Sequence, residues 1–344
     1  MQWLIYIFLI PVVVLIGGGI IGLYAKGVDR KFAAYYQSRI GPPLRQPFYD
    51  IGKLMQKQTI IPENAVGWIF SGAPFVALAS SVILLVYILV PYFAWIGDFN
   101  FFFSNSGDII LILYLLMIPS IALVAGGFAS GSPYATLGAQ REMVILMSTE
   151  LPLAVTAVTF AWRLSHVAPG ASHFSLVTMS SHPLWSGMGP FGILGGMLLA
   201  LSIAVVIPAE LAKIPFDQAE AETEIAEGLL AEYSGKYLAF YQIADGVKSL
   251  AVISLAVILF FPNGFVQMTG YRIVPAGYDI TLLLDVVLFM VKVFLVYFVS
   301  VTTVRIAMAR LKISQVAKLF LVTITVMCLA GYVLITLDPV IRTL

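Results

Sequence analysis

The chain contains eight apolar runs that are each long enough to cross a lipid bilayer. They lie near Trp3–Tyr24, Ile69–Trp95, Ile109–Phe128, Met143–Trp162, Phe191–Ala209, Leu238–Phe261, Ile280–Val304 and Val316–Leu337. A helix needs about 20 apolar residues to span the hydrocarbon core. Hydrophobic residues make up 60% of the 344 residues, against about 45–50% in soluble domains. We therefore predict one all-α integral membrane domain over residues 1–344, a polytopic bundle of about eight transmembrane helices with short cytoplasmic interfacial helices.

The basic residues predict how this bundle is oriented. Fourteen Lys and Arg lie in loops after the odd-numbered runs and three lie after the even-numbered runs or in the tail; Lys248 and Lys292, inside runs, complete the total of 19. Cytoplasmic loops carry an excess of Lys and Arg. This bias predicts a multi-pass protein of the cytoplasmic membrane with both termini outside.

An acidic run spans residues 209–236, between two membrane runs. Pro215 suits the first turn of a helix. A rotation of about 100° per residue then places Asp217, Glu220, Glu224 and Glu227 within about 80° of one face. Carboxylates on an enclosed face repel one another and resist desolvation, so some of them should hold protons near neutral pH. A solvated acidic loop is the alternative. The run holds seven of the chain's 18 acids: Glu210, Asp217, Glu220, Glu222, Glu224, Glu227 and Glu232.

Further ionisable residues lie inside the predicted membrane runs. They are Glu142 and Glu150 in the fourth run, Asp245 and Lys248 in the sixth, and Asp285 and Lys292 in the seventh. Each charge inside a membrane needs a partner or an aqueous path. The Asp–Lys spacings of three and seven place each pair on one helix face. They can form self-satisfied ion pairs or belong, with the acidic run, to a proton path opening on the cytoplasm.

The first polar loop, residues 26–68, is predicted to carry two short helices. Apolar residues at helical spacing indicate the first, along the membrane surface, and Pro47–Lys57 indicates the second. The loop can anchor to lipid or dock a soluble partner, and its length favours docking. The predicted docking residues, with one from the fourth run, are Phe32, Tyr35, Tyr36, Arg39, Arg45, Asp50, Lys53 and Arg141.

Nothing in the sequence indicates a cofactor or metal site within this chain. Its single cysteine, Cys328, lies inside an apolar run, and the histidines His166, His173 and His182 show no paired helical spacing. Iron–sulfur clusters need several cysteine ligands. We expect no redox cofactor or metal, no catalytic residue, and no nucleic acid as a partner.

Three motifs together resemble the heel subunit of respiratory complex I, the NuoH type. They are IPFDQAEAETEIAEGLLAEYSG, the first-loop pair RIGP and QPFYDIGKL, and SPYATLGAQRE at residues 132–142. The resemblance covers essentially the whole chain. It implies a subunit that joins a cytoplasmic electron-transfer arm to antiporter-like membrane subunits, with the acids forming part of a proton path. Asp245, Lys248, Asp285 and Lys292 rest on the membrane-charge argument above.

One departure from the quinone-reducing form favours the membrane-bound nickel–iron hydrogenase branch. Only Leu44 and Arg45 separate Pro43 from Gln46, whereas the quinone-reducing form has a longer segment there. The branch implies hydrogenase-like large and small subunits and a ferredoxin-type iron–sulfur subunit as partners, with iron–sulfur clusters and nickel–iron in those partners. The alternatives are a quinone-site heel subunit, a stand-alone proton or sodium transporter, and an inert membrane anchor.

Overall fold

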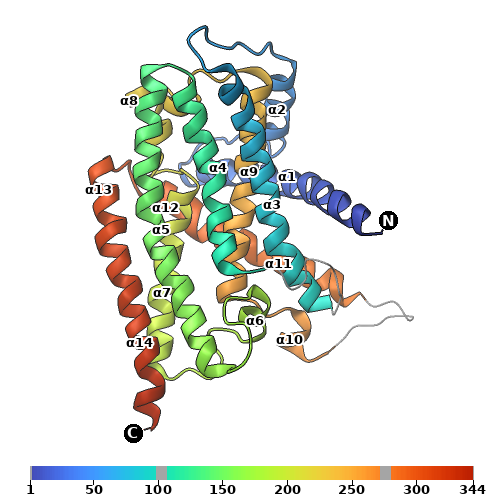
Figure 1. Cartoon of the computed structure of the whole chain (residues 1–344), viewed down its shortest axis with the longest axis vertical. Helices are drawn as coiled ribbons and strands as arrows, with labels where there is room; N and C mark the ends of the chain where they lie inside the picture. The colour runs from blue at the N-terminus through green and yellow to red at the C-terminus, as the bar shows by residue number, and fades with distance from the viewer. Residues whose placement is uncertain (1, 98–106, 272–279, 344) are drawn as a thin grey trace.

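The computed structural model describes residues 2–97, 107–271 and 280–343, with the side chains of residues 2–8, 222 and 340–343 left out. Within these ranges the chain is helical and has no named strand. Eight helical stretches are long and apolar enough to cross a membrane. They confirm the predicted all-α membrane bundle (Figure 1).

The helices follow one another in simple order. The spanning helices are α1 (Gln2–Tyr36), α3 (Gly67–Gly97), α4 (Ile109–Ala129), α5 (Pro133–Val167), α7 (Pro190–Glu210), α9 (Gly235–Phe260), α11 (Thr281–Tyr297) with α12 (Thr303–Ala307), and α13 (Ile313–Lys318) with α14 (Thr325–Thr343). Shorter helices are α2 (Gln46–Gln56), α6 (Leu176–Ser181), α8 (Glu222–Ile225) and α10 (Phe265–Thr269). π-helical turns join α11 to α12 (η4, Phe298–Thr302) and α13 to α14 (η5, Leu319–Ile324).

Helix α9 is the centre of the bundle. Every residue from Gly246 to Phe260 is buried, as expected of a helix that is apolar all round and surrounded by others. Helices α1, α3 and α11 pack on it, and α14 packs on α7 at the far edge of the bundle. In Figure 1, α1 crosses the bundle obliquely and its N-terminal half projects away from it.

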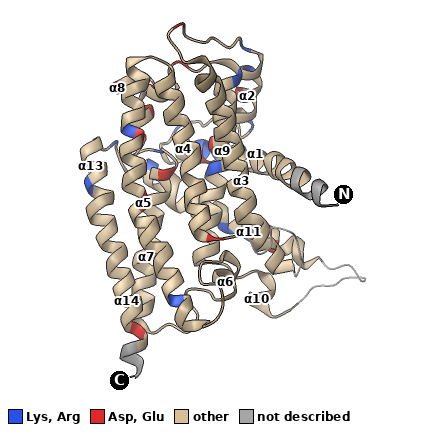
Figure 2. Ribbon diagram, viewed as in Figure 1, with Lys and Arg blue, Asp and Glu red and all other residues tan. Residues whose placement is uncertain are grey.

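Two ends of the bundle are named by the segments they carry. The acidic end carries the acidic segment, defined as Leu211–Ser234, together with α2 and the loop before α3, and the distal end carries α6 and α10 (Figure 1). Charged residues are concentrated in the upper half of Figure 2, toward the acidic end, whereas the lower half is mostly uncharged.

The first helix is longer than the predicted run Trp3–Tyr24. It continues without a break from Gln2 to Tyr36, so Val28–Tyr36 is the inner end of α1 and not a separate helix on the membrane surface. The helix continues because Lys26 and Asp29 find charged partners inside the bundle. The second predicted helix is confirmed as α2.

The acidic segment also differs from its prediction. It is a folded loop with turns at Gln218–Glu220 (η1), α8 and Gly228–Leu230 (η2). Ala226, Glu227 and Gly228 all have positive φ, at 49°, 68° and 49°, which a right-handed helix cannot accommodate. Asp217, Glu220, Glu224 and Glu227 therefore do not share one helix face.

Candidate functional site: a charged cavity beside the acidic segment

A cavity of about 510 Å³ lies between the acidic segment and helices α1, α7 and α9. Its wall is unusual because so many of its side chains are ionisable. They are Lys26, Asp29, Arg30, Asp50, Glu142, Glu210, Lys213, Asp217, Glu220, Asp245, Lys248, Arg305 and Arg310. Ligand pockets are mostly apolar with few polar groups, so this wall suits water and ions better than an apolar molecule.

Asp245 on α9 joins three elements at the mouth of this cavity. Its Oδ2 lies 2.8 Å from Lys26 Nζ of α1 and 2.9 Å from Lys213 Nζ of the acidic segment. Gly22 makes the approach of α1 possible, since a Cβ there would lie 2.2 Å from the carbonyl oxygen of Gly246. Asp245 is therefore paired across helices, so the alternative of a self-satisfied Asp245–Lys248 pair within α9 does not hold.

Lys248 pairs instead with Glu210, the last residue of α7. Its Nζ lies 2.9 Å from Glu210 Oε1, and it also donates to the Glu210 carbonyl (2.8 Å) and to Ser120 Oγ of α4 (2.7 Å). All three residues are buried. A buried ion pair is stable only when its remaining hydrogen-bonding groups are satisfied, as they are here.

Asp29 on α1 is a site residue that the sequence analysis missed. It is buried, accepts a hydrogen bond from Thr302 Oγ1 at 2.7 Å, and lies 2.5 Å from Arg305 Nη1. The π-helical turn before α12 shifts the register of that helix and places Thr302 beside α1. Asp29 would have been found if the first predicted helix had been extended beyond Tyr24, because Asp29 then lies about one helical turn from Lys26.

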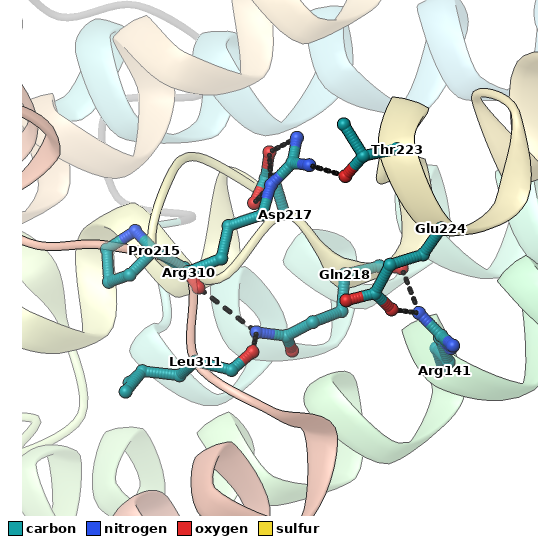
Figure 3. Close-up of polar contacts among 8 residues, drawn as sticks. All are labelled: Arg141, Pro215, Asp217, Gln218, Thr223, Glu224, Arg310 and Leu311. Atoms are coloured by element: carbon teal, nitrogen blue, oxygen red, sulfur yellow. Dashed lines mark hydrogen bonds and ion pairs between the residues drawn. The ribbon is translucent and has the colours of Figure 1, made fainter.

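Two arginines hold the acidic segment in place (Figure 3). Arg310, in the linker between α12 and α13, donates from Nε and Nη2 to both carboxylate oxygens of Asp217 at 2.6–3.0 Å and from Nη1 to Thr223 Oγ1 at 3.0 Å. Arg141 of α5 donates to Glu224 Oε2 at 2.6 Å and to the Gln218 carbonyl at 3.3 Å.

The linker between α12 and α13 and the acidic segment are also joined by hydrogen bonds that involve backbone groups. The Gln218 side-chain amide donates to the carbonyls of Leu311 at 2.7 Å and Pro215 at 3.0 Å (Figure 3). The Leu311 N–H also donates to the carbonyl of Pro215 at 3.3 Å. On its other side the segment packs closely on α5. A Cβ on Gly138 would lie 2.7 Å from the backbone nitrogen of Leu229. The segment is therefore a tightly held part of the bundle and not a solvated loop.

Glu220 is the acid of this segment whose proton affinity is most perturbed. Burial, partly offset by Lys213, and the neighbouring charge of Asp245 raise the pKa of Glu220 to about 7. For Lys213, burial opposes the charged form, but Asp245 and Glu220 outweigh it and raise its pKa. A carboxyl with a pKa near 7 exchanges its proton readily at neutral pH.

Glu142 and Glu150 of α5 lie in the cavity wall and within electrostatic range of Glu210, respectively. Glu142 is buried. The Oε1 atom of Glu150 is buried without a hydrogen-bond partner among the described residues. Thr149 connects the two helices by donating to Glu210 Oε2 at 3.2 Å. The acids of α5 and α7 thus continue inward from the cavity.

Asp285 and Lys292, predicted to form an ion pair with each other or to belong to the proton path, lie at the distal end and bind backbone groups there. Asp285 accepts from the backbone N–H of Phe265 at 2.5 Å. Lys292 donates to the backbone carbonyls of Phe261 and Asn263. These residues bind backbone groups around the end of α9, so the structure separates them from the charged cavity.

The remaining predicted residues lie at or near the surface of the acidic end. Glu227 is exposed, Glu232 is half-buried, and the side chain of Glu222 lies outside the described residues. Asp50 lies 3.3 Å from Arg30 and is tied to the cavity wall. The other predicted docking residues of this end are exposed: Phe32, Tyr35, Tyr36, Arg39, Arg45 and Lys53.

Among the described residues, no group of three or more His, Cys, Asp or Glu side chains is arranged to hold a metal ion. Cys328 is buried in the bundle beside Thr156. The site therefore consists of proton-binding groups and fixed cations, contributed by several helices and one folded segment.

The chain matches the family described as NADH dehydrogenase over residues 8–336. The chain belongs to this family. The assignment agrees with the resemblance carried by the acidic run and the first-loop motifs, and it covers every residue of the charged cavity. The family membership and the eight spanning helices together make this chain a multi-pass membrane protein.

Relatives in the NADH dehydrogenase family include subunits of several oxidoreductases. Hydrogenase-4 component C of Escherichia coli (strain K12) is 31% identical over 263 residues, covering 76% of this chain and 78% of that protein. Formate hydrogenlyase subunit 4 of the same organism is 32% identical over 240 residues, covering 70% and 73%. A subunit of the NADH-quinone oxidoreductase of Bacillus cytotoxicus is 28% identical over 270 residues, covering 75% of each chain.

A solved structure shows the same fold. It is a chain in the structure of the membrane-bound sulfane sulfur reductase, described as an archaeal respiratory membrane complex. The TM-score is 0.76 at 24% identity, and the match covers 95% of this chain and 99% of that chain. At this identity the likeness concerns the fold alone.

Proposed function

We propose that this chain is the ion-translocating coupling subunit of a membrane-bound, hydrogenase-type oxidoreductase complex. It joins a cytoplasmic electron-transfer arm to antiporter-like membrane subunits. The arm holds the hydrogenase-like large and small subunits and a ferredoxin-type iron–sulfur subunit. In this proposal the iron–sulfur clusters and the nickel–iron centre belong to those partners, and this chain has no redox centre of its own. The acidic end faces the cytoplasm, as the basic residues predict.

The observation that carries this proposal is the set of proton-binding groups leading inward from the acidic segment. Glu142, Glu210, Glu220 and Asp245 all line the cavity, and Glu150 lies within electrostatic range of Glu210. Carboxylates within electrostatic range of one another titrate together, so a charge change at one end alters proton affinity at the next. Electron transfer in a docked arm supplies such a charge change.

Two relatives support the hydrogenase branch. Hydrogenase-4 component C and formate hydrogenlyase subunit 4 are both more than 30% identical to this chain. The many charged side chains in the cavity wall also disfavour the alternative of a quinone site, because an isoprenoid tail gains nothing from ionised neighbours. An inert anchor gives no reason for buried acids, because an ionisable group inside a membrane costs free energy.

The test uses the purified whole complex in sealed vesicles. Glu220→Gln and Glu150→Gln each keep the shape of the side chain but remove its titratable proton. We expect normal assembly and electron transfer, with the ions moved per electron greatly reduced, because a positioned proton-transfer group speeds its step by roughly 10²–10⁴-fold. A pH-sensitive dye inside the vesicles measures the yield.

Glu227→Gln is the matched control, because Glu227 belongs to the same segment but is exposed. It should pump like the wild type. Wild-type yields from both Glu220→Gln and Glu150→Gln would contradict the proposed function.

A further inference from the structure

Lys248 fills a buried cage of oxygen atoms. Its ammonium group has three N–H donors, and the three acceptors Ser120 Oγ, Glu210 O and Glu210 Oε1 surround it at 2.7, 2.8 and 2.9 Å. Hydroxyl, carbonyl and carboxylate oxygens are also the groups that bind small hard metal cations. The lysine therefore occupies, as a tethered cation, a position that is chemically suited to a free one.

This cage lies where the polar cavity ends. Ser120, Glu210 and Lys248 all line the 510 Å³ cavity. A second cavity of about 30 Å³ lies further in, and among the described residues Glu210 is the one that lines both. Apart from Glu210 and Thr156, the wall of the second cavity is apolar. Glu210, paired with Lys248, thus lies between a chamber with many charged side chains and a small, mostly apolar one.

A proton and a metal cation need different groups in order to pass this boundary. A metal cation needs several oxygen ligands at once, and the second cavity is small and offers few polar groups. A metal cation at the boundary therefore needs the cage oxygens, but these are taken by a fixed like charge. A proton needs only a chain of acids or waters, and Glu210 has Thr149 and Glu150 on its inner side.

We propose that Lys248 is a specificity-determining residue of the ion path. Its ammonium fills the oxygen cage that a sodium ion needs and so restricts the inner end of the polar cavity to protons. The inference rests on the proposed function and adds to it the identity of the ion that this chain passes. Lys248 acts by occupying the cage and by holding Glu210, not by carrying the transported proton.

The experiment compares wild type and Lys248→Gln in vesicles that contain the whole complex. Proton yield per electron is measured in choline medium and again after sodium chloride replaces choline. The wild type should give the same yield in both media. In Lys248→Gln the cage oxygens are free, so sodium should bind there and reduce the proton yield several-fold. Lys248→Arg keeps the cation and should stay insensitive to sodium.

Two further variants make the result specific to the cage. Removing one ligand as well, in Lys248→Gln with Ser120→Ala, should weaken the sodium effect. Lys292→Gln removes a partly buried lysine at the distal end and should behave like the wild type. If Lys248→Gln does not assemble, Lys248→Met keeps the length of the aliphatic stem, and the same sodium response is expected from it.

The outcomes separate this inference from the proposed function. Identical sodium responses in wild type and Lys248→Gln would overturn the role of Lys248, even if Glu150→Gln and Glu220→Gln abolish pumping. If those two variants pump normally, the proposed function fails first, and the inference fails with it.

Discussion

Aspartate and lysine side chains bind different kinds of partner at the two ends of α9. At the acidic end, Asp245 and Lys248 bind charged side chains of α1, α7 and the acidic segment. At the distal end, Asp285 and Lys292 of α11 bind backbone N–H and C=O groups around the end of α9. The backbone groups of the distal end cannot change their charge. Charged partners can, so under the proposed function the acidic end, among the described residues, is the end suited to couple a charge change to proton movement.

The side chains of the distal end hold the C-terminal end of α9 in place. The last carbonyls of a helix have no partner within it. Tyr92 OH donates to the Pro262 carbonyl at 2.9 Å and Trp185 Nε1 donates to the Phe260 carbonyl at 2.7 Å, beside the two carbonyls bound by Lys292. Side chains from separate parts of the chain thus fix this end while the other end carries the titratable groups.

The largest difference between the two ends should follow from removing one aspartate charge at each. Asp245→Asn leaves Lys26 and Lys213 without their shared carboxylate, which should cost about 2–4 kcal/mol given their partial exposure. Asp285→Asn keeps an acceptor for the Phe265 N–H and should cost about 1 kcal/mol. Thermal unfolding of the purified complex compares the two variants. An equal or larger loss for Asp285→Asn would contradict the contrast drawn between the ends.

The second prediction compares how pH affects the local stability of the acidic end and of the distal end. Because the pKa of Glu220 is raised to about 7 from its ordinary value of 4.5, folding favours its protonated form. The stability it contributes is present below pH 4.5 and is lost as pH rises toward about 7. Hydrogen exchange in the acidic segment should therefore quicken as pH rises through this window, after correction for the intrinsic pH dependence of exchange.

Glu220→Gln is the control for that measurement and should make the corrected exchange independent of pH in this window. The amides of α10, at the distal end, should show no corrected pH dependence in either protein. A persistent pH response of the acidic segment in Glu220→Gln would assign the titration to another group.

The smallest effect expected is a difference between the two arginines of the acidic segment. Arg310→Lys keeps the charge but loses the fork-shaped contact with Asp217 and Thr223, so opening of the segment should become easier by about 1–2 kcal/mol. Arg141→Lys affects a contact with the half-exposed Glu224 and should cost under about 1 kcal/mol. Hydrogen exchange of the segment measures both, and a larger effect at Arg141 would contradict this order.

Much of the site could be named from the sequence, because buried charge is rare in membrane helices. Glu142, Glu150, Asp245 and Lys248 were identified as groups that need a partner or an aqueous path, and Glu210 as a member of the acidic run. Their partners could not be identified, since spacing along one helix reports only neighbours on that helix. Lys26, Lys213 and Arg310 reach the site from segments far apart in sequence, and their pairing depends on how the helices pack.

By itself, the sequence determined the class of this protein and the position of its spans. Bilayer thickness and backbone hydrogen bonding leave apolar runs of this length no other stable form. It could not determine the course of the acidic segment, because helical spacing there was overridden by the left-handed backbone at Ala226, Glu227 and Gly228. The tertiary structure alone decided which charges meet, because a buried charge takes whichever opposite charge packing brings within reach. That choice placed Lys248 against Glu210 and left Lys292 to bind the backbone at the other end.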